Sequence, residues 1–250
     1  MRSFLLLFRN QALGFIREPA AAVFNLLVPF VIVVIQALAL GTQQIGNDLP
    51  GYRVVDALPV NAGVMFGIIV GLFGMGVGLA SMIESRALAG FSLRPGGVKM
   101  ILLAYGLVLL VMVLLGWIFS CLALWLGWDI RAPDHAAVAV LVLLLGVCVF
   151  LALGACIAAV TGSPRGAQGV CSAVFFPLLF LSGAVFPVDT FPSALERVSS
   201  WLPGYRFSEL LAPTWVEGQS FDWVSLAYLV VMLVVASFLA QRLLFRREDV

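Results

Sequence analysis

The sequence predicts an all-α integral membrane protein with six membrane-spanning helices. Of its 250 residues, 62% are hydrophobic and 11% are charged. One soluble core could not bury that much apolar surface. The charged residues also leave long gaps, and a bilayer core of ~30 Å needs about 20 apolar helical residues to cross it. The charge-free stretches predict spans at residues 19–40, 57–83, 100–128, 136–164, 166–188 and 223–241.

The segment before the first span, residues 1–18, has the pattern of an amphipathic helix. On a helical wheel its apolar residues cover one arc and its polar residues the opposite one. The apolar set is Phe4, Leu5, Phe8, Ala12, Phe15 and Ile16, and the polar set is Arg2, Arg9, Asn10 and Arg17. We expect this helix to lie flat on the membrane with its arginines toward anionic head groups.

The distribution of basic residues predicts the orientation in the membrane. With six spans both termini lie on one side, and placing them inside puts ten of the fourteen Lys and Arg residues there. The positive-inside rule therefore favours cytoplasmic N- and C-termini.

The spans lack the side chains that membrane chemistry requires. None of the six contains Asp, Glu, Lys, Arg or His, which disfavours an ion-driven transporter. The chain has no HExxH motif, no GxxxxGK[ST] phosphate loop and no CxxC pair among its four cysteines. No catalytic, cofactor or metal site is predicted in this chain.

Small residues recur every four positions in the second span. Such spacing lets helix backbones approach closely, so we expect tight packing against a neighbouring helix or a partner subunit. Prolines in the first and fifth spans, Pro29 and Pro177, should kink their helices. The small residues are Gly63, Gly67 and Gly71, followed by Gly74 and Gly78.

The largest cytoplasmic segment is residues 84–99. Its part ESRALAGFSL can form about two helical turns, which Arg94-Pro95-Gly96-Gly97 would end. A short helix there would be a contact for a soluble partner, and the alternative is a plain turn between two spans.

The outer segment between the last two spans, residues 186–205, is broken by Pro187 and by Pro203-Gly204. Ser193 and Glu196 have the spacing of a capping box, which predicts a short helix over about 193–202. Its apolar face would lie where lipid or protein meets water. The segment is either an interfacial loop helix or a re-entrant element at the outer mouth of a transport route.

Taken together, these features resemble the permease subunit of ABC-2 type exporters, and the resemblance covers nearly the whole chain. The features are the N-terminal interface helix leading through REPAAAVFNLLVPF, Glu84 opening a segment that ends near Pro95, and LSGAVFP followed by the outer helix. The chain departs from the family after the outer helix, where Leu202-Pro203-Gly204-Tyr205 replaces a common Asn-Pro pair.

The resemblance implies a dimer of two identical or paralogous permeases with two ATP-binding subunits in a bacterial inner membrane. ATP and magnesium would be bound by those partners, and this chain would need no cofactor. The segments facing the ATPases would be the interface helix and residues 84–92, with the contact residues Arg2, Arg9, Arg17, Glu84, Ser85, Arg86, Phe91 and Arg94. The resemblance also implies a re-entrant gate at the outer segment, with gate residues Phe180, Phe186, Pro187, Leu195 and Trp201.

The uncharged spans favour a hydrophobic or amphipathic cargo such as a drug, an antibiotic or a lipid. Export of a polysaccharide or a lipid-linked glycan is the alternative. Two other classes stay open, a non-transporting membrane scaffold and a lipid-modifying enzyme. The enzyme would have to use the outer acidic residues, which show no ligand spacing: Asp189, Glu196, Glu209, Glu217 and Asp222.

Overall fold

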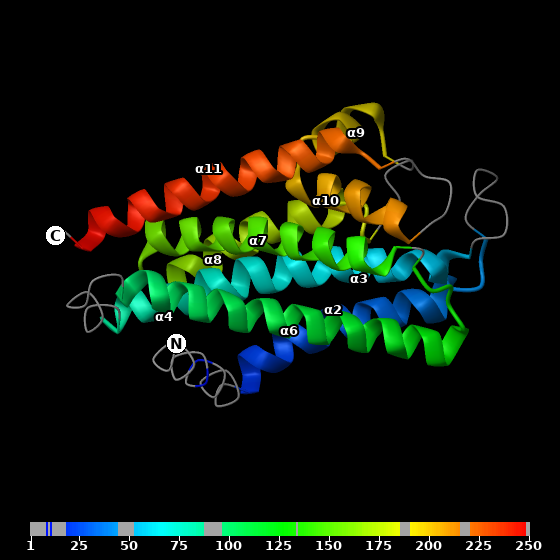
Figure 1. Cartoon of the computed structure of the whole chain (residues 1–250), viewed down its shortest axis with the longest axis horizontal. Helices are drawn as coiled ribbons and strands as arrows, with labels where there is room; N and C mark the ends of the chain where they lie inside the picture. The colour runs from blue at the N-terminus through cyan, green and yellow to red at the C-terminus, as the bar shows by residue number, and fades with distance from the viewer. Residues whose placement is uncertain are drawn as a thin grey trace.

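The computed structural model describes residues 9, 11, 19–44, 53–87, 97–133, 135–185, 191–215 and 221–248, which form a bundle of helices (Figure 1). Within these ranges no strand occurs, and Gln44 and Arg53 form an isolated β-bridge. The helices are α2 (Pro19–Leu40), α3 (Val54–Ile69), the π-helical η1 (Val70–Met75), α4 (Gly76–Glu84), α6 (Gly97–Trp128), α7 (Ala136–Thr161), α8 (Pro164–Leu181), α9 (Ser193–Ser199), α10 (Pro203–Leu211), the 3₁₀ turn η3 (Ala212–Thr214) and α11 (Trp223–Glu248).

The continuous helical segment α3–η1–α4 is the centre of the bundle. In its most apolar window 89% of the residues are buried, against 22% to 44% in the other three long apolar helices. In Figure 1 α2 and α6 lie on one side of it and α7 and α8 on the other, with α11 packed on α7. The segment predicted as the second span is therefore the core of the fold.

Glycines bring α7 against this central helix. A Cβ at Gly71 would overlap Phe150 of α7, and a Cβ at Gly154 of α7 would overlap the Gly71 carbonyl oxygen. Only glycine permits backbones this close, so the packing predicted from the glycine spacing is confirmed.

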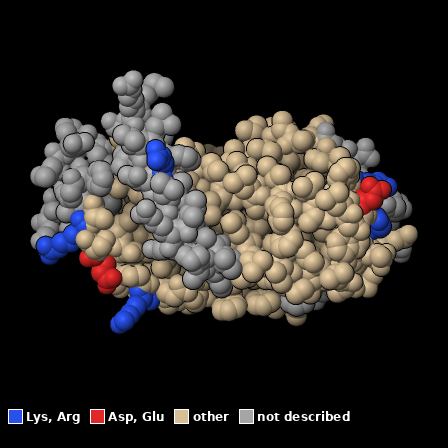
Figure 2. Space-filling model, turned by 90° about the horizontal axis from the view of Figure 1, so that it is seen from below, with Lys and Arg blue, Asp and Glu red and all other residues tan. Residues whose placement is uncertain are grey.

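The outer faces of the bundle are apolar along most of its length. Leu103 of α6 is 68% exposed and Trp223 of α11 is 71% exposed. Figure 2 shows the described Lys, Arg, Asp and Glu residues of this face gathered at the two ends, with other residues between them. Such an exterior is stable only in an apolar environment.

Four helical segments of the described chain are long and apolar enough to cross a membrane: Val54–Glu84, Lys99–Trp128, Ala136–Thr161 and Trp223–Leu244. The two other predicted spans also fall on helices, α2 and α8. The count of six spans stays a prediction.

Two local predictions are wrong, and a third falls largely outside the described residues. Ser193 begins α9, but the helix is capped by Pro192, and no side-chain capping bond forms because the Pro192 carbonyl accepts from the N–H groups of Leu195 and Glu196. α4 ends at Glu84 and residues 85–87 form a turn, while the rest of the stretch predicted to form two helical turns lies outside the described residues. The predicted break at Pro203-Gly204 begins a new helix, α10, in which Pro203 takes the first position that proline favours.

Of the predicted interface helix, residues 1–18, the described residues are Arg9 and Gln11, and both are helical. The rest of that prediction lies outside the described residues.

Candidate functional site

The α9–α10 element is anchored in the bundle by Phe207. This side chain is fully buried, and its ring fits between two glycines of the facing helices. A Cβ at Gly67 of α3 would lie 3.0 Å from the ring, and one at Gly146 of α7 would overlap it. The element is thus an integral part of the packed core, whereas a surface loop would leave such a ring exposed.

The turn between α9 and α10 is tied to three helices. The Ser199 hydroxyl donates to the Leu181 carbonyl at the end of α8. Arg206 Nε of α10 donates to the Ser200 carbonyl at 2.7 Å, and the Tyr228 hydroxyl of α11 donates to the Trp201 carbonyl at 2.6 Å. These bonds fix the position of the turn relative to the bundle.

An ion pair joins α10 to the start of α11. Arg206 lies 3.8 Å from the carboxylate of Asp222, and the Ser225 hydroxyl donates to the same carboxylate at 2.5 Å. The bond from Ser225 and, to a smaller extent, the N–H of Val224 and the charge of Arg206 hold the pKa of Asp222 below its ordinary value. Asp222 is therefore ionised at neutral pH.

The predicted gate residues lie around this element with exposed side chains. Phe180 on α8 is 42% exposed, Leu195 on α9 is 43% exposed and Trp201 in the turn is 76% exposed. The structure brings their segments together through the Ser199–Leu181 bond. Phe186 and Pro187 lie outside the described residues.

The predicted coupling residues Glu84, Ser85 and Arg86 form the end of α4. Arg86 has a φ of 54°, the left-handed conformation that usually requires glycine. Its N–H donates to the Ile83 carbonyl at 3.1 Å, and the N–H of Ala87 donates to the Met82 carbonyl at 3.1 Å. This pair of bonds is a Schellman motif, which ends the helix and leaves all three residues exposed.

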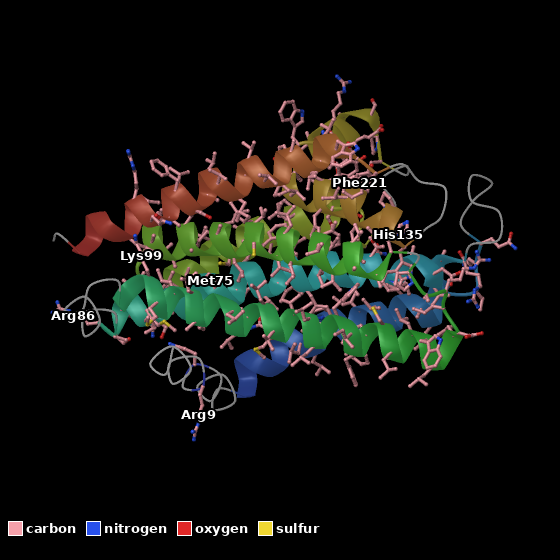
Figure 3. The ribbon with its side chains drawn as sticks, viewed as in Figure 1. Arg9, Met75, Arg86, Lys99, His135 and Phe221 are labelled. Atoms are coloured by element: carbon pink, nitrogen blue, oxygen red, sulfur yellow. The ribbon has the colours of Figure 1, made fainter. Side chains whose placement is uncertain are left out.

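Several basic side chains gather at this end of the bundle. Figure 3 shows Arg9, Arg86 and Lys99 there, and His135 toward the opposite end. Arg9 and Arg86 are exposed. The other predicted coupling residues, Arg2, Arg17, Phe91 and Arg94, lie outside the described residues.

A buried carboxylate at the opposite end was missed by the sequence analysis. Asp56 is 1% exposed. It accepts from the backbone N–H of Arg53 at 2.9 Å and of Arg131 at 3.2 Å, while the Arg53 guanidinium donates to the Asp129 carbonyl at 2.9 Å. The network joins the start of α3 to the connection between α6 and α7. An acidic residue in the first turn of an apolar helix was the available signal.

No group of three or more His, Cys, Asp or Glu that could hold a metal ion occurs among the residues described. The outer acidic residues Glu196 and Asp222 accordingly show no arrangement for metal-dependent chemistry.

Comparison with known proteins gives a family for most of the chain. Residues 2–214 match the family described as ABC-2 type transporter. Nodulation protein J of Rhizobium leguminosarum bv. viciae is 40% identical over 79 residues, which is 29% of this chain and 30% of that protein. Nodulation protein J of Rhizobium leguminosarum bv. trifolii is 36% identical over 75 residues, which is 30% of this chain and 29% of that protein. Each match thus covers less than a third of the relative.

The fold agrees with this match. The helices, the apolar exterior and the four candidate spans are those of a multi-pass membrane protein. The matched domain is the membrane component of its transporters and not the ATPase, in agreement with the missing phosphate loop. This chain belongs to the ABC-2 type transporter family.

Proposed function

We propose that the chain is the permease subunit of an ATP-driven exporter that moves a hydrophobic or amphipathic compound, a drug, an antibiotic or a lipid, out of the cytoplasm or the inner leaflet. Family membership supports the transport role. The cargo is inferred from one surface, the exposed face of α8.

This α8 face is apolar and leads to the α9–α10 element. Val170, Val174, Phe176 and Phe180 are between 37% and 56% exposed on it. The rings of Phe176 and Phe180 are stacked with centroids 6.4 Å apart. A charge-free, partly aromatic face of this kind suits an apolar or amphipathic molecule. Contact between the two would not require a charged group to give up its bound water.

The α9–α10 element is proposed as the outer, re-entrant gate of this route. Its support is the burial of Phe207 inside the bundle together with the exposed Leu195 and Trp201 above the end of α8. The gate would open when α8 and the turn at Ser199–Leu202 separate.

The opposite end is proposed as the contact for two ATP-binding subunits, with the termini in the cytoplasm of a bacterial cell. Exposed Arg9, Glu84 and Arg86 support this assignment. ATP-driven closure of the partners would move the interface helix and the end of α4 together, and a second permease, identical or paralogous, would complete the route. ATP and magnesium would be bound in the partners.

A polysaccharide or a lipid-linked glycan is the second candidate cargo. The observation that favours it is the pair of stacked, exposed rings of Phe176 and Phe180, since flat aromatic faces also contact the C–H face of a sugar ring. The two cargo classes are distinguished by which of them stimulates ATP hydrolysis in the purified complex.

The first experiment is to purify the tagged full chain from its native membrane, identify the proteins that accompany it and assay ATP hydrolysis. We expect a stoichiometric nucleotide-binding subunit and vanadate-sensitive activity. A chain that purifies alone and without ATPase would overturn the permease assignment in favour of a scaffold.

The coupling role is tested by Glu84→Ala in the reconstituted complex. We expect ATP hydrolysis to become uncoupled from cargo export, with the membrane fold intact. The matched control is Asp129→Asn, which removes an exposed carboxylate at the opposite end and outside the proposed gate. Unchanged export and unchanged stimulated ATPase in Glu84→Ala would end this assignment.

A further inference from the structure

The central helical segment contains a stretch of π-helix where the sequence predicts one continuous span. Residues Val70–Met75 form η1 between α3 and α4, and all six are buried. π-Helical segments are rare, and their wide turn disturbs the usual pairing of each carbonyl with the N–H four residues later. Figure 3 places Met75, the last residue of η1, inside the bundle between the ends marked by Arg86 and His135. The irregular backbone therefore lies in the core.

Two side chains from other helices donate to the carbonyls of η1. The Tyr105 hydroxyl of α6 donates to the Gly74 carbonyl at 2.7 Å, and the Cys171 thiol of α8 donates to the Leu72 carbonyl at 3.2 Å. Both side chains are buried. The Leu72 carbonyl also accepts from the N–H of Gly76, so the thiol adds a second bond there. Both side-chain bonds stabilise the π-helical backbone, because buried carbonyls are costly to leave without donors.

Three glycines lie in or next to η1, where larger residues would restrict the backbone dihedral angles. Gly71 and Gly74 lie within η1, and Gly76 begins α4. A Cβ at Gly76 would lie 2.8 Å from the Cys171 sulfur. Glycine has the greatest backbone freedom of all residues, so the backbone of η1 can bend with little intrinsic cost, although Gly71 also packs closely against α7.

The two helices that flank η1 are held differently. The far end of α3 is fixed, since Asp56 joins it to the α6–α7 connection and Trp117 Nε1 donates to the Pro59 carbonyl at 2.8 Å. The first part of α4, with the buried residues Gly76, Leu79 and Ala80, lies against α7 and α8, whereas its far end is the exposed residue Glu84. The nine residues of α4 span about 14 Å, so a bend of about 10° at η1 would move Glu84 by about 2 Å.

We infer that η1 is a hinge of the central helix and that Tyr105 and Cys171 are positioning residues that hold it in the π-helical conformation. The inference of a hinge rests only on the π-helical backbone of η1 and on the contacts of its residues. The use of the hinge in transmitting motion to and from an ATPase rests on the proposed function.

The hinge is tested by amide hydrogen exchange of the full chain in lipid nanodiscs. We expect the amides of residues 70–76 to exchange faster than those of residues 60–67, although all residues of both stretches except Asn61 are buried. Tyr105→Phe should raise exchange over 70–78 by about fivefold, the effect of losing one typical hydrogen bond. Cys171→Ala should raise it less, because a thiol is a weak donor.

Two glycine substitutions complete the test. Gly74→Ala should slow exchange in η1, since its Cβ would meet only the side-chain ends of Leu109 at 3.1 Å and Val70 at 3.3 Å. The matched control is Gly106→Ala on α6, whose Cβ would be 3.6 Å from Met75, an ordinary contact, and which should leave exchange unchanged.

The hinge is overturned if residues 70–76 exchange no faster than residues 60–67, or if Tyr105→Phe and Cys171→Ala both leave their exchange unchanged. A second arm measures cargo moved per ATP hydrolysed by the complex, which Gly74→Ala should lower and Gly106→Ala should not. If no ATPase partner is found, the proposed function fails while the exchange data still decide the hinge.

Discussion

The ring of Phe207 on α10 occupies the space that a side chain at Gly146 of α7 would need. Gly67 of α3 borders the same ring. The two glycines thus form a slot between α3 and α7, and the slot sets how far α10 enters the bundle. The depth at which α10 packs in the bundle therefore depends on this contact, in addition to the hydrogen bonds that hold the turn between α9 and α10.

Gly146→Ala should therefore destabilise the α10 anchor. Added volume in a packed core costs about 1–3 kcal/mol. We expect a lower Tm in detergent. Gly169→Ala on α8 is the matched control, because its Cβ would meet nothing within 4 Å and because it gains the same helix propensity. Equal Tm values for the two variants would contradict the conclusion that Gly146 leaves the space in which the Phe207 ring packs.

The charge-free apolar stretches of the sequence predict the long helices well but not the contacts that position them. The segments at 19–40 and 136–164 correspond closely to α2 and α7 because charge and turn residues bound them. The helix α10 was not predicted, because Pro203-Gly204 read as a break and the burial of Phe207 depends on glycines far away in sequence. The π-helix was not predicted either, since the glycines of VGLFGM also fit a regular α-helix.

Asp56→Ala should weaken the end of the bundle opposite Glu84. The change leaves the N–H groups of Arg53 and Arg131 without their acceptor, which costs about 1–3 kcal/mol for a buried group. The expected result is a lower Tm than that of the unmodified chain. Asp129→Asn is the control, since Arg53 binds the Asp129 backbone carbonyl and Asn tolerates the left-handed φ of 50° at this position. A loss of stability in Asp129→Asn as large as in Asp56→Ala would refute this account of the network.

The Asp222–Arg206 pair should give a pH-dependent contribution to stability. The folded pKa of Asp222 lies below its ordinary value of 3.8, so its contribution is fully present above that pH and is lost as the pH falls through the folded pKa. Asp222→Asn keeps a side chain that can cap α11 through the Val224 N–H and removes the charge.

We expect Asp222→Asn to melt below the unmodified chain at pH 7 and the difference to shrink only below about pH 4, the ordinary range of an aspartate. Asp222→Ala also loses the cap and should melt lower still at both pH values. A Tm difference between the unmodified chain and Asp222→Asn that stays constant down to pH 3 would show that the charge is irrelevant.

At the end of α4 the sequence indicates where charged residues lie but not the backbone conformation that they adopt. Charged residues such as Glu84 and Arg86 can be placed at a helix end from the sequence, because the free-energy cost of burying a charge in the membrane keeps them near its surface. The left-handed conformation of Arg86 could not be predicted, since glycine is the usual residue there. The backbone conformation of Arg86 costs stability, whereas its side chain is proposed to contact the ATPase. A substitution at this position can therefore separate the effect on stability from the effect on coupling.

Arg86→Gly should make the permease more stable and less well coupled. Glycine removes the cost of about 1–2 kcal/mol that a side chain bears in the left-handed region, so the Tm should rise. If the guanidinium contacts the ATPase as proposed, cargo export per ATP hydrolysed should fall in the same variant. Arg86→Lys, which keeps both the strain and the positive charge, should leave the Tm unchanged and retain most of the coupling. An Arg86→Gly permease that is more stable and exports as efficiently as the unmodified chain would show that the arginine has no part in coupling.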